Sequence, residues 1–473
     1  MAESSLLMTT AQLTDSVSGD CLCDYTRQNG FTSVATDSRN VLPLSLFIPL
    51  RGETQDGHSY IPKAMEMGAV IVLADKAHAL AAADQLRTLG KKYNACVIIV
   101  ENNLHALQDA ARTYISFFPN LLKIGITGSS GKTTTKEITA SIFAQKYSVV
   151  MNEGNLNSET GLPLSVFKIR AEHEAGIFEL GMNRRGEIAE IARVLSPSLA
   201  LITNIGTAHI GILGTQQAIA EEKKEIFSFF DSDGLGFIPE GDPWYEFLSI
   251  VPSGKIRPYG PSTTEGFEGS ESLGIDGTLI HYKGKNIRFA LPGEYNLRNA
   301  LASISLAQSA GVTPEQIKDG IERVQPLFGR TQVIHGEITI LMDCYNANPD
   351  SMESALEFCI DVEWSGNKIY VLASMLELGD ESSAAHAKIC RIASKSGMGT
   401  FYLFGEDMIA AGRSTEWGKT DVSFCASIDE LSSALSAKAK PGDLVFLKGS
   451  RGMALERVCP VLTGRSDTGN CHG

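Results

Sequence analysis

A strand-to-helix turn with the pattern of a phosphate-binding loop constrains the fold more than any other feature of the sequence. The apolar run 123–127 leads into a loop with glycines at Gly128 and Gly131, and a helical pattern opens around Thr133. Glycines at these positions let backbone N–H groups turn inward around an oxyanion, and a helix N-terminus adds the positive end of its dipole. Lys132 contributes a point charge, and the hydroxyl of Thr133 stands where such loops bind Mg²⁺. The turn therefore predicts a nucleotide-binding domain.

The spacing of this loop departs from the long form of the motif. Ile126 occupies the position of the first glycine, whereas the second half, from Gly128 through Lys132 to Thr133, is retained. Glycines alone would also make a tight turn with an ordinary surface lysine. Lysine followed by threonine at a helix start, directly after an apolar strand, favours nucleotide binding over that plain alternative.

Short apolar runs alternate with helical patterns along most of the chain. Each run has the length and composition of a buried strand, and each is followed by a turn or a helix start. The runs cover residues 123–127, 176–180, 199–205, 368–372, 400–404 and 443–447. Alternation of this kind predicts an α/β protein built on largely parallel sheets.

A chain of 473 residues is too long for one ordinary core, so several domains are expected. Breakers at 118–120 and 324–336 mark two boundaries, and three strand-plus-helix units follow the second. The predicted domains are an N-terminal domain over 1–120, a central ATP-binding domain over 121–328 and a C-terminal domain over 329–473.

Composition excludes several classes of protein. The apolar fraction of 43% and the charged fraction of 20% are those of a globular chain, and the net charge of −14 argues against binding to nucleic acid or to anionic membranes. Nine scattered cysteines, an odd number with no CxxC pair, indicate a reducing compartment. No basic leader or long apolar stretch is present, so a cytoplasmic protein without membrane insertion is expected.

Two polar residues stand at the ends of predicted strands. Glu179 lies near the end of the run 176–180, and His209 follows the run 199–205. Ligands of open α/β sheets gather beyond the carboxyl ends of the strands, so both side chains are candidates to face the phosphate loop, with Glu179 on Mg²⁺. A salt-bridge acid and an ordinary loop histidine are the plain alternatives. In the helical pattern 218–227, periodicity indicates only a charged amphipathic helix and does not single out Lys223.

These pieces, in their order along the chain, resemble the Mur ligases of peptidoglycan synthesis over essentially the whole sequence. The shared motifs stand at 37–39, 51–53, 56–58, 127–137, 154–157, 179–181, 204–209, 223–227, 293–299, 329–330, 343–352, 375–379 and 448–453. Glu222 departs from the pattern, because the family usually has alanine before the lysine at 223.

The segment 343–352 discriminates among the branches of the family. Its sequence is similar to that of the branch that joins D-alanyl-D-alanine to UDP-N-acetylmuramoyl-tripeptide, whereas sister ligases carry an Asp-x-Ala-His variant. Two alternatives to this assignment are another amide ligase of the superfamily, such as a sister Mur ligase or folylpolyglutamate synthase, and a P-loop nucleotide switch without ligase activity.

The resemblance implies a fold and a reaction. It implies a central P-loop-type ATPase domain with a parallel sheet, flanked by an N-terminal α/β domain that binds the UDP substrate and a C-terminal Rossmann-like domain. It also implies an ADP-forming ligase that activates a carboxylate as an acyl phosphate and passes through a tetrahedral intermediate. The resemblance also implies ATP and two Mg²⁺ ions as cofactors, and a monomeric enzyme.

The resemblance further implies a role for individual residues. Catalytic roles fall to Lys132, Glu179, His209 and Lys223, the last as a carbamate. Metal ligands are Thr133, Glu179, His209 and carbamylated Lys223. Contacts to ATP come from Gly128, Ser129, Ser130, Gly131, Lys132, Thr133, Thr134, Asn296, Asn299, Arg330 and Asp343. Contacts to the other substrates come from Ser38, Arg39, Asn155, Asn157, Tyr345, Asn346 and Asn348.

Overall fold

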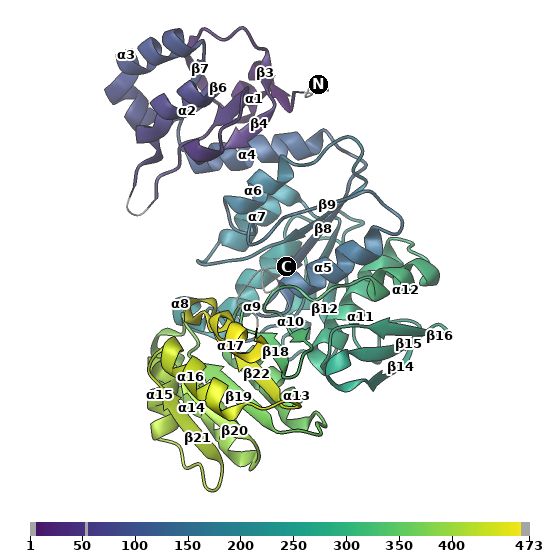
Figure 1. Ribbon diagram of the computed structural model, residues 1–473. Coiled ribbons are helices and arrows are strands. Elements are labelled where there is room, and N and C mark those ends of the chain that lie inside the picture. The colour runs from purple at the N-terminus through teal and green to yellow at the C-terminus, as the bar shows by residue number, and fades with distance from the viewer. Residues whose placement is uncertain (1–5, 53–54, 465–473) are drawn as a thin grey trace. The chain divides into compact units, whose positions relative to one another are not determined.

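The computed structural model describes residues 6–52 and 55–464 (Figure 1). Contacts divide the chain into two compact units. The first comprises the described residues up to Gly125, with Ser148–Ser198 and Glu225–Asp231. The second comprises Ile126–Tyr147, Leu199–Lys224 and the described residues from Ser232 onward. Among the residues so described, no helix is both long and apolar enough to cross a membrane.

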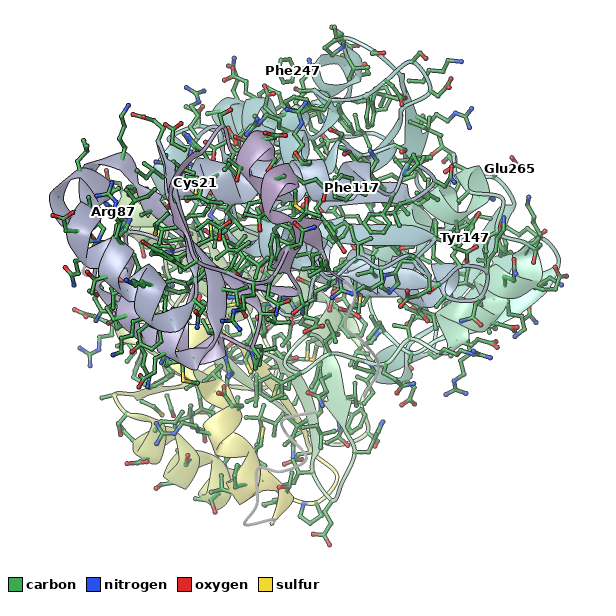
Figure 2. The ribbon with its side chains drawn as sticks, turned by 90° about the horizontal axis from the view of Figure 1, so that it is seen from above. Cys21, Arg87, Phe117, Tyr147, Phe247 and Glu265 are labelled. Atoms are coloured by element: carbon green, nitrogen blue, oxygen red, sulfur yellow. The ribbon has the colours of Figure 1, made fainter. Side chains whose placement is uncertain are left out.

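The N-terminal part of the first unit is built on a five-stranded sheet in the order β2-β7-β6-β5-β4. Its strands are β2 (Asp20–Asp24), β4 (Ser33–Ala35), β5 (Ser45–Phe47), β6 (Ala69–Asp75) and β7 (Cys96–Val100). All neighbours pair in parallel except β2, which is antiparallel to β7 at one edge. Helices α2 (Ile61–Met67) and α3 (Lys76–Tyr93) pack on this sheet through a shared apolar cluster. Figure 2 labels Cys21 on β2 and Arg87 on α3, which contacts that strand.

The remainder of the first unit is formed by helices and two parallel strands. The helices are α1 (Thr10–Ser16), α4 (Asn103–Ser116), α6 (Gly161–Val166) and α7 (Glu187–Leu195), and α4 contacts the other three. A two-stranded ribbon joins β1 (Met8–Thr9) to β3 (Gly30–Phe31). Strand β9 (Val149–Met151) pairs with β10 (Ala175–Glu179), which is buried throughout and ends at the acidic residue Glu179.

A six-stranded sheet in the order β13-β12-β11-β8-β10-β9 contains the strand that leads into the phosphate loop. That strand is β8 (Leu122–Thr127), and β11 (Leu199–Ile202), β12 (Leu235–Pro239) and β13 (Lys255–Tyr259) pair in parallel in the second unit. The helices of this region are α5 (Lys132–Phe143), α8 (Ile210–Leu213), α9 (Gln216–Lys224), α10 (Tyr245–Ser249), α11 (Glu294–Ser309) and α12 (Pro314–Glu322). Helix α11 lies along α5, where the hydroxyl of Thr139 donates to Ser303 Oγ at 3.0 Å.

A small antiparallel sheet follows β13 in the second unit. It consists of β14 (Phe267–Ser272), β15 (Thr278–Tyr282) and β16 (Lys285–Phe289). Strands β15 and β16 form a hairpin whose two loop residues, Lys283 and Gly284, both have positive φ. Two positive φ values give the backbone twist that closes a two-residue hairpin.

The C-terminal sheet of the second unit has the order β17-β18-β22-β19-β20-β21 and helices on both faces (Figure 1). Its strands are β17 (Gln332–Ile334), β18 (Thr339–Asp343), β19 (Lys368–Ala373), β20 (Thr400–Phe404), β21 (Asp421–Cys425) and β22 (Leu444–Lys448). The helices are α13 (Pro349–Asp361), α14 (Ser382–Lys395), α15 (Glu406–Arg413), α16 (Ile428–Lys438) and α17 (Cys459–Thr463). Only β17 is antiparallel to its neighbour.

Alternate residues of β22 enter opposite cores of this sheet. Leu444 and Phe446 pack with α13 and α14, whereas Val445 and Leu447 pack with α16 and α17. Side chains of a strand point alternately to its two faces, so a strand covered by helices on both sides is apolar at every position. This is why residues 444–447 form a continuous apolar run in the sequence.

The predicted α/β class with largely parallel sheets is confirmed, and several predicted strands match closely. The run 400–404 coincides with β20, whereas the run predicted over 199–205 ends at Ile202. Strands β18 and β21 add two units to the three predicted after residue 336, and the antiparallel sheet β14–β16 was not expected. The domain boundaries at 120 and 328 stay a prediction. Of the nine cysteines, the eight in the described residues are free thiols, and Cys471 lies outside those residues.

Candidate active site

The turn between β8 and α5 has the backbone conformation that its glycines predict. Gly128 has φ +152° and Gly131, which caps α5, has φ +79°. A Cβ at Gly128 would lie 1.8 Å from Thr203 Oγ1, and one at Gly131 would lie 2.6 Å from Asn299 Oδ1. Both positions therefore exclude a side chain for steric as well as for conformational reasons. The turn ends at a twelve-residue helix whose N-terminus attracts anions.

Asn204 holds the phosphate loop from the end of the neighbouring strand β11. Its Oδ1 accepts hydrogen bonds from the amides of Ser129 at 3.1 Å and Ser130 at 2.9 Å, and its Nδ2 donates to Ser130 Oγ at 3.0 Å. The hydroxyl of Thr203 donates to the carbonyl of Ser130 at 2.5 Å. Because Asn204 takes the first two loop amides, the N–H groups nearest the helix start, from Gly131 onward, are the ones oriented for an anion. The sequence motif contained Asn204 but did not reveal this role.

Lys132 lies folded over the loop beside two other basic groups. Its Nζ donates to the carbonyl of Gly128 at 2.8 Å. The positive charge of Lys132 also lowers the pKa of His209 and of Lys223, so the three side chains are close enough to interact electrostatically. The structure thus brings together three residues that the sequence analysis placed in one site.

His209 is held in an unusual backbone conformation with an unsatisfied ring nitrogen. Its φ of +67° lies in the left-handed region at the start of α8. Its Nδ1 is buried without a hydrogen-bond partner. Burial first, then the charges of Lys132 and Lys223, lower the pKa of His209 to about 4. A neutral imidazole with an unpaired nitrogen is the form that binds a metal ion, so His209 fits the metal role predicted for it.

Lys223 is a fully buried amine near the end of α9, with 1% of its surface exposed. Burial and then the charge of Lys132 lower the pKa of Lys223 well below its ordinary value, and the buried neighbour Glu222 opposes this shift. Carbamylation by CO₂ requires the neutral amine as its nucleophile, and a lowered pKa favours that form. The surroundings of Lys223 therefore fit the predicted modification, although Glu222 works against it.

The two asparagines of α11 connect the phosphate loop to the C-terminal sheet. Asn299 lies against Gly131 and donates to Asn296 Oδ1 at 3.3 Å. Asn296 is buried, and its Nδ2 donates to Thr331 Oγ1 at 3.5 Å. The amide of Thr331 donates to Asp343 Oδ1 at 3.2 Å. Three residues predicted to contact ATP, Asn299, Asn296 and Asp343, are thus linked through Thr331 in one chain of hydrogen bonds.

Asp343 and Lys448 form a largely buried ion pair at the carboxyl ends of β18 and β22. Lys448 Nζ lies 2.7 Å from Asp343 Oδ2, and its side chain is 2% exposed. It also donates to the carbonyl of Asn346 at 3.1 Å. The guanidinium of Arg330 stacks on the ring of Tyr345, 4.2 Å from the centroid. Arg330, Asp343, Tyr345 and Asn346 therefore gather at one edge of the C-terminal sheet, as a shared site requires.

Helix α13 begins beside the phosphate loop. Asn348 caps the helix by accepting from the amide of Ser351 at 2.9 Å, and its Nδ2 reaches the carbonyl of Ser129 at 3.5 Å. Asp350 Oδ2 accepts from both the amide and the hydroxyl of Thr207, at 2.7 and 3.0 Å. Asn348 was among the predicted substrate contacts, whereas no feature of the sequence indicated a role for Asp350, whose contact joins residues 143 positions apart.

Glu179 and the residues predicted to bind the UDP-linked substrate lie in the first unit, where each has different neighbours. Glu179 is buried, and its Oε1 accepts from Asn157 Nδ2 at 2.7 Å. Asn155 is exposed in the loop that precedes Asn157. Ser38 is buried, whereas the guanidinium of Arg39 is exposed and pairs with the carboxylate of Asp37. The side chain of Glu179 is therefore oriented by Asn157, and Arg39 is held at the surface.

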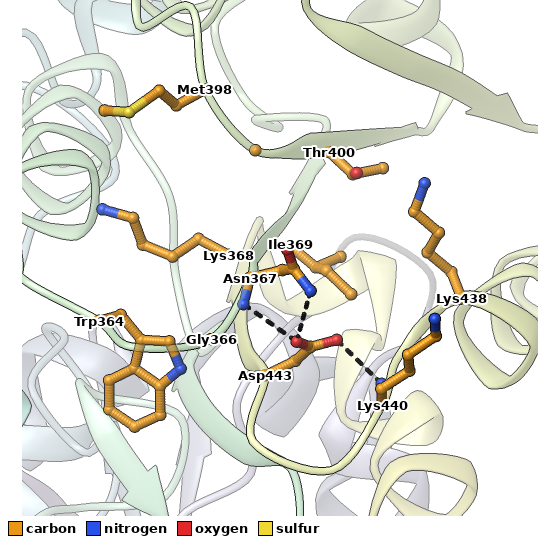
Figure 3. Close-up of a pocket in the computed structure, with 11 residues that line it drawn as sticks. Trp364, Gly366, Asn367, Lys368, Ile369, Met398, Thr400, Lys438, Lys440 and Asp443 are labelled. Atoms are coloured by element: carbon orange, nitrogen blue, oxygen red, sulfur yellow. Dashed lines mark hydrogen bonds between the residues drawn. The ribbon is translucent and has the colours of Figure 1, made fainter.

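A cavity of about 550 Å³ lies elsewhere in the second unit, at the amino ends of β19 and β20 (Figure 3). Its polar groups bind one another. Asp443 accepts from Asn367 and from the amide of Lys440, and Lys368 Nζ donates to three carbonyls at the end of α13. The predicted site residues of this sheet stand at the opposite, carboxyl ends of its strands. The cavity therefore lies between loops at the end of the sheet away from the predicted site residues.

Three family models match the chain and together span most of it. The model described as "Mur ligase family, catalytic domain" matches residues 30–115, "Mur ligase middle domain" matches 126–307, and "Mur ligase, glutamate ligase domain" matches 329–451.

Curated relatives and solved structures agree with these matches. The UDP-N-acetylmuramoyl-tripeptide–D-alanyl-D-alanine ligase of Treponema pallidum is 46% identical, covering 97% of this chain and 99% of that protein. The enzyme of that name from Bacillus subtilis is 33% identical, covering 95% and 97%. A crystal structure of MurF from Acinetobacter baumannii superposes with a TM-score of 0.85 at 26% identity, covering 97% and 99% of the two chains. The MurF ligase from Thermotoga maritima, solved in complex with ADP, gives a TM-score of 0.78 at 25% identity, covering 91% and 97%.

The buried amine of Lys223 predicts a specific pH dependence of stability. The pKa of Lys223 in the folded chain lies below its ordinary value of 10.5. At a pH between the folded-state pKa and 10.5, the unfolded chain therefore holds a proton on Lys223 that the folded chain does not. The penalty for burying Lys223 is therefore largest at the low end of this window and fades as the pH approaches 10.5. We expect Lys223→Met to raise the midpoint of thermal unfolding in CO₂-free buffer at pH 7, with a gain that shrinks toward pH 10.

Lys419→Met, at an exposed lysine, is the matched control and should leave the midpoint unchanged at each pH. A gap between Lys223→Met and the wild type that stays constant from pH 7 to 10 would contradict a depressed pKa.

Proposed function

The chain belongs to the Mur ligase family, and we propose that it is the ATP-dependent ligase that joins D-alanyl-D-alanine to the terminal carboxylate of UDP-N-acetylmuramoyl-tripeptide. The observation that carries this proposal is the phosphate loop with Lys132, His209 and Lys223 gathered beside it. The match to curated ligases of that name over almost the full chain supports the choice of substrates. Peptidoglycan precursor synthesis is the process that this reaction serves.

The reaction needs activation because a carboxylate is a poor electrophile. A carboxylate oxygen of the tripeptide attacks the γ-phosphorus of ATP, the bond to the β-phosphate oxygen breaks, and ADP leaves. The amine of D-alanyl-D-alanine then attacks the acyl carbon of the resulting acyl phosphate. This attack forms the new C–N bond and gives a tetrahedral intermediate, which then loses the proton of its nitrogen and expels phosphate as the C–O bond breaks. One ATP is consumed for each amide bond.

The chain's own groups can lower the barrier to phosphoryl transfer mainly by position and charge. We assign the loop from Gly128 to Thr134 to the ATP phosphates, with the N-terminus of α5 facing them. Lys132 offsets the negative charge that spreads over the transferred phosphoryl group. Asn204 keeps the loop in this shape before substrate binds, so no ordering cost falls on the reaction.

The residues beside the loop fit Mg²⁺, because His209 has a buried, unpartnered nitrogen and because burial lowers the pKa of Lys223, which favours the neutral amine that carbamylation needs. We propose Thr133 and Glu179 as ligands of one ion, and His209 with carbamylated Lys223 as ligands of a second. Mg²⁺ bound to these residues would neutralise charge on the phosphate oxygens. Carbamylation replaces a cation that repels the metal by an anion that binds it.

The remaining predicted residues divide between the nucleotide and the other two substrates. We assign Asn296 and Asn299 to adenine, and Arg330 and Asp343 to the ribose and phosphates. Ser38, Arg39, Asn155 and Asn157 would contact the UDP-linked tripeptide, whereas Tyr345, Asn346 and Asn348 would contact the dipeptide. We further propose a monomeric enzyme that acts in the cytoplasm.

A nucleotide switch without ligase activity is the contrasting alternative, and a phosphate-release assay separates the two. The proposed reaction releases phosphate only when both the UDP-linked tripeptide and D-alanyl-D-alanine are present, since the acyl phosphate is consumed by the amine. We expect stoichiometric phosphate and amide product in the complete mixture, and little phosphate when either substrate is omitted. Nucleotide hydrolysis that is indifferent to the peptides would favour the switch.

Replacing Lys132 by alanine tests the assignment of the loop. Removal of the charge nearest the transferred phosphoryl group is expected to lower kcat at least ~10²-fold, the scale of losing one preorganised electrostatic group. Circular dichroism should remain that of the wild type, since Lys132 is not part of a core. Lys419→Ala, at an exposed lysine, should retain full activity. Near-normal turnover by Lys132→Ala would contradict the assignment.

Replacing Lys223 by alanine tests the carbamate. We expect a large loss of ligation that formate or acetate partly restores, because a small carboxylate can occupy the space of the missing side chain and bind the metal in its place. In the wild type, ¹³C-bicarbonate should yield a carbamate carbon signal that Lys223→Ala lacks. Absence of both the rescue and the signal would remove Lys223 from the metal site.

A further inference from the structure

The segment between β11 and α9 carries His209 and is anchored to the phosphate loop at one end. The amide of Gly206 donates to Ser129 Oγ at 2.9 Å, and Asn204 binds the amides of Ser129 and Ser130. Gln216 Nε2 donates to the carbonyl of Ile205 at 3.0 Å from the start of α9. These contacts hold residues 203–206 but do not extend to His209 itself.

Thr207 is held from the opposite side by Asp350 of helix α13. One carboxylate oxygen, Oδ2, accepts from both the amide and the hydroxyl of Thr207. Hydrogen bonds to an ionised acceptor are shorter and stronger than those between neutral groups. Asn348 is the N-cap of α13, so Asp350 is not needed to cap the helix and its side chain is directed to another segment.

Thr207 in turn contacts the start of the short helix α8, whose N-cap is His209. Its carbonyl accepts from the amide of Ile210 at 3.1 Å, and the carbonyl of His209 accepts from Leu213 at 3.0 Å. His209 lies two residues from Thr207 and adopts a left-handed φ, a conformation that persists only where the surroundings impose it. The backbone on both sides of His209 therefore depends on Thr207.

A second contact supports the same segment from the C-terminal sheet. A Cβ at Gly211 would lie 2.9 Å from the carbonyl of Leu378, and η5 (Gly379–Glu381) packs against α8. Asp350 and Leu378 both belong to the part matched by the C-terminal family model, whereas Thr207 and Gly211 belong to the part matched by the middle model.

We infer that Asp350 is a positioning residue that, by binding Thr207, aims the imidazole of His209 at the metal site beside the phosphate loop. The inference rests on the proposed function, and it deepens it by naming the group through which the C-terminal part of the chain completes that site. Asp350 acts through Thr207 and does not itself contact substrate or metal. Partners that orient a metal ligand typically change metal affinity or activity 10–100-fold when they are removed.

The test uses the full chain and measures metal binding apart from turnover. Mn²⁺ is titrated in the presence of saturating ADP, and free Mn²⁺ is followed by electron paramagnetic resonance. Asp350→Ala is expected to weaken Mn²⁺ binding 10–100-fold and to raise the Mg²⁺ concentration for half-maximal ligation by a similar factor. Asp350→Asn, whose amide oxygen still accepts from Thr207, should recover most of the loss. Glu357→Ala, an exposed acid on the same helix, is the matched control and should change neither value.

Thr207→Val completes a double-mutant cycle. If the two residues act through one contact, Asp350→Ala should weaken Mn²⁺ binding less in the Thr207→Val background than in the wild type. Additive losses in Mn²⁺ affinity would overturn the inference, as would an Asp350→Ala enzyme with wild-type affinity. Should Asp350→Ala lower the thermal midpoint and fail to fold, Thr207→Val decides, because unchanged Mn²⁺ affinity in that variant also overturns it.

The same series separates this inference from the proposed function. A wild-type enzyme that binds Mn²⁺ and ADP but forms no amide product overturns the proposed reaction. A wild-type enzyme that ligates normally, with an Asp350→Ala variant equal to it, overturns only the role of Asp350.

Discussion

The burial of basic groups around one phosphate loop is the constraint on which the rest of the site depends. Lys132, His209 and Lys223 lie close enough for their charges to interact, within a protein whose net charge is −14. Burial and the charge of Lys132 lower the pKa of His209 and of Lys223, which favours the neutral form of each. Those neutral forms are the ones that bind a metal or capture CO₂.

Part of this site could be predicted from the sequence, because local chemistry marks it. The glycines, Lys132 and Thr133 follow a strand at fixed spacing, and that pattern is legible within a dozen residues. Asn204 and Asp350 carry no such mark, because their partners lie about 75 and 143 residues away. A side chain that satisfies the backbone of a distant segment leaves no periodicity and no motif of its own. The roles of Asp350 and Asn204 can be recognised only in the folded structure, where their distant partners lie beside them.

The strands that could be predicted from the sequence differ in burial from those that could not. Strands covered on both faces, such as β20 and β22, are apolar at four of their five positions and were predicted closely. The prediction for β11 was too long: the strand ends at Ile202, and the side chains of Thr203 and Asn204, which follow the apolar run, bind the phosphate loop. Strand β21 at the sheet edge has three half-exposed positions, and the exposed face of β14 is largely polar. Such edge and surface strands give weaker apolar signals, so they were missed.

Gly206 shows how closely the phosphate loop and helix α13 approach each other. A Cβ at this position would lie 2.2 Å from Asp350 Oδ2 and 3.2 Å from the Cβ of Ser129, so the glycine is enclosed between the two. Its φ is not in the left-handed region, and the requirement for glycine is therefore one of space and not of conformation. Any side chain here would force the carboxylate of Asp350 away from Thr207, since the backbone on the other side is already fixed by Ser129. Hydrogen bonds to a charged acceptor contribute roughly 1.5–3 kcal/mol each, and they weaken steeply with added distance. The absence of a side chain at residue 206 is thus what allows one carboxylate to hold the segment that carries His209.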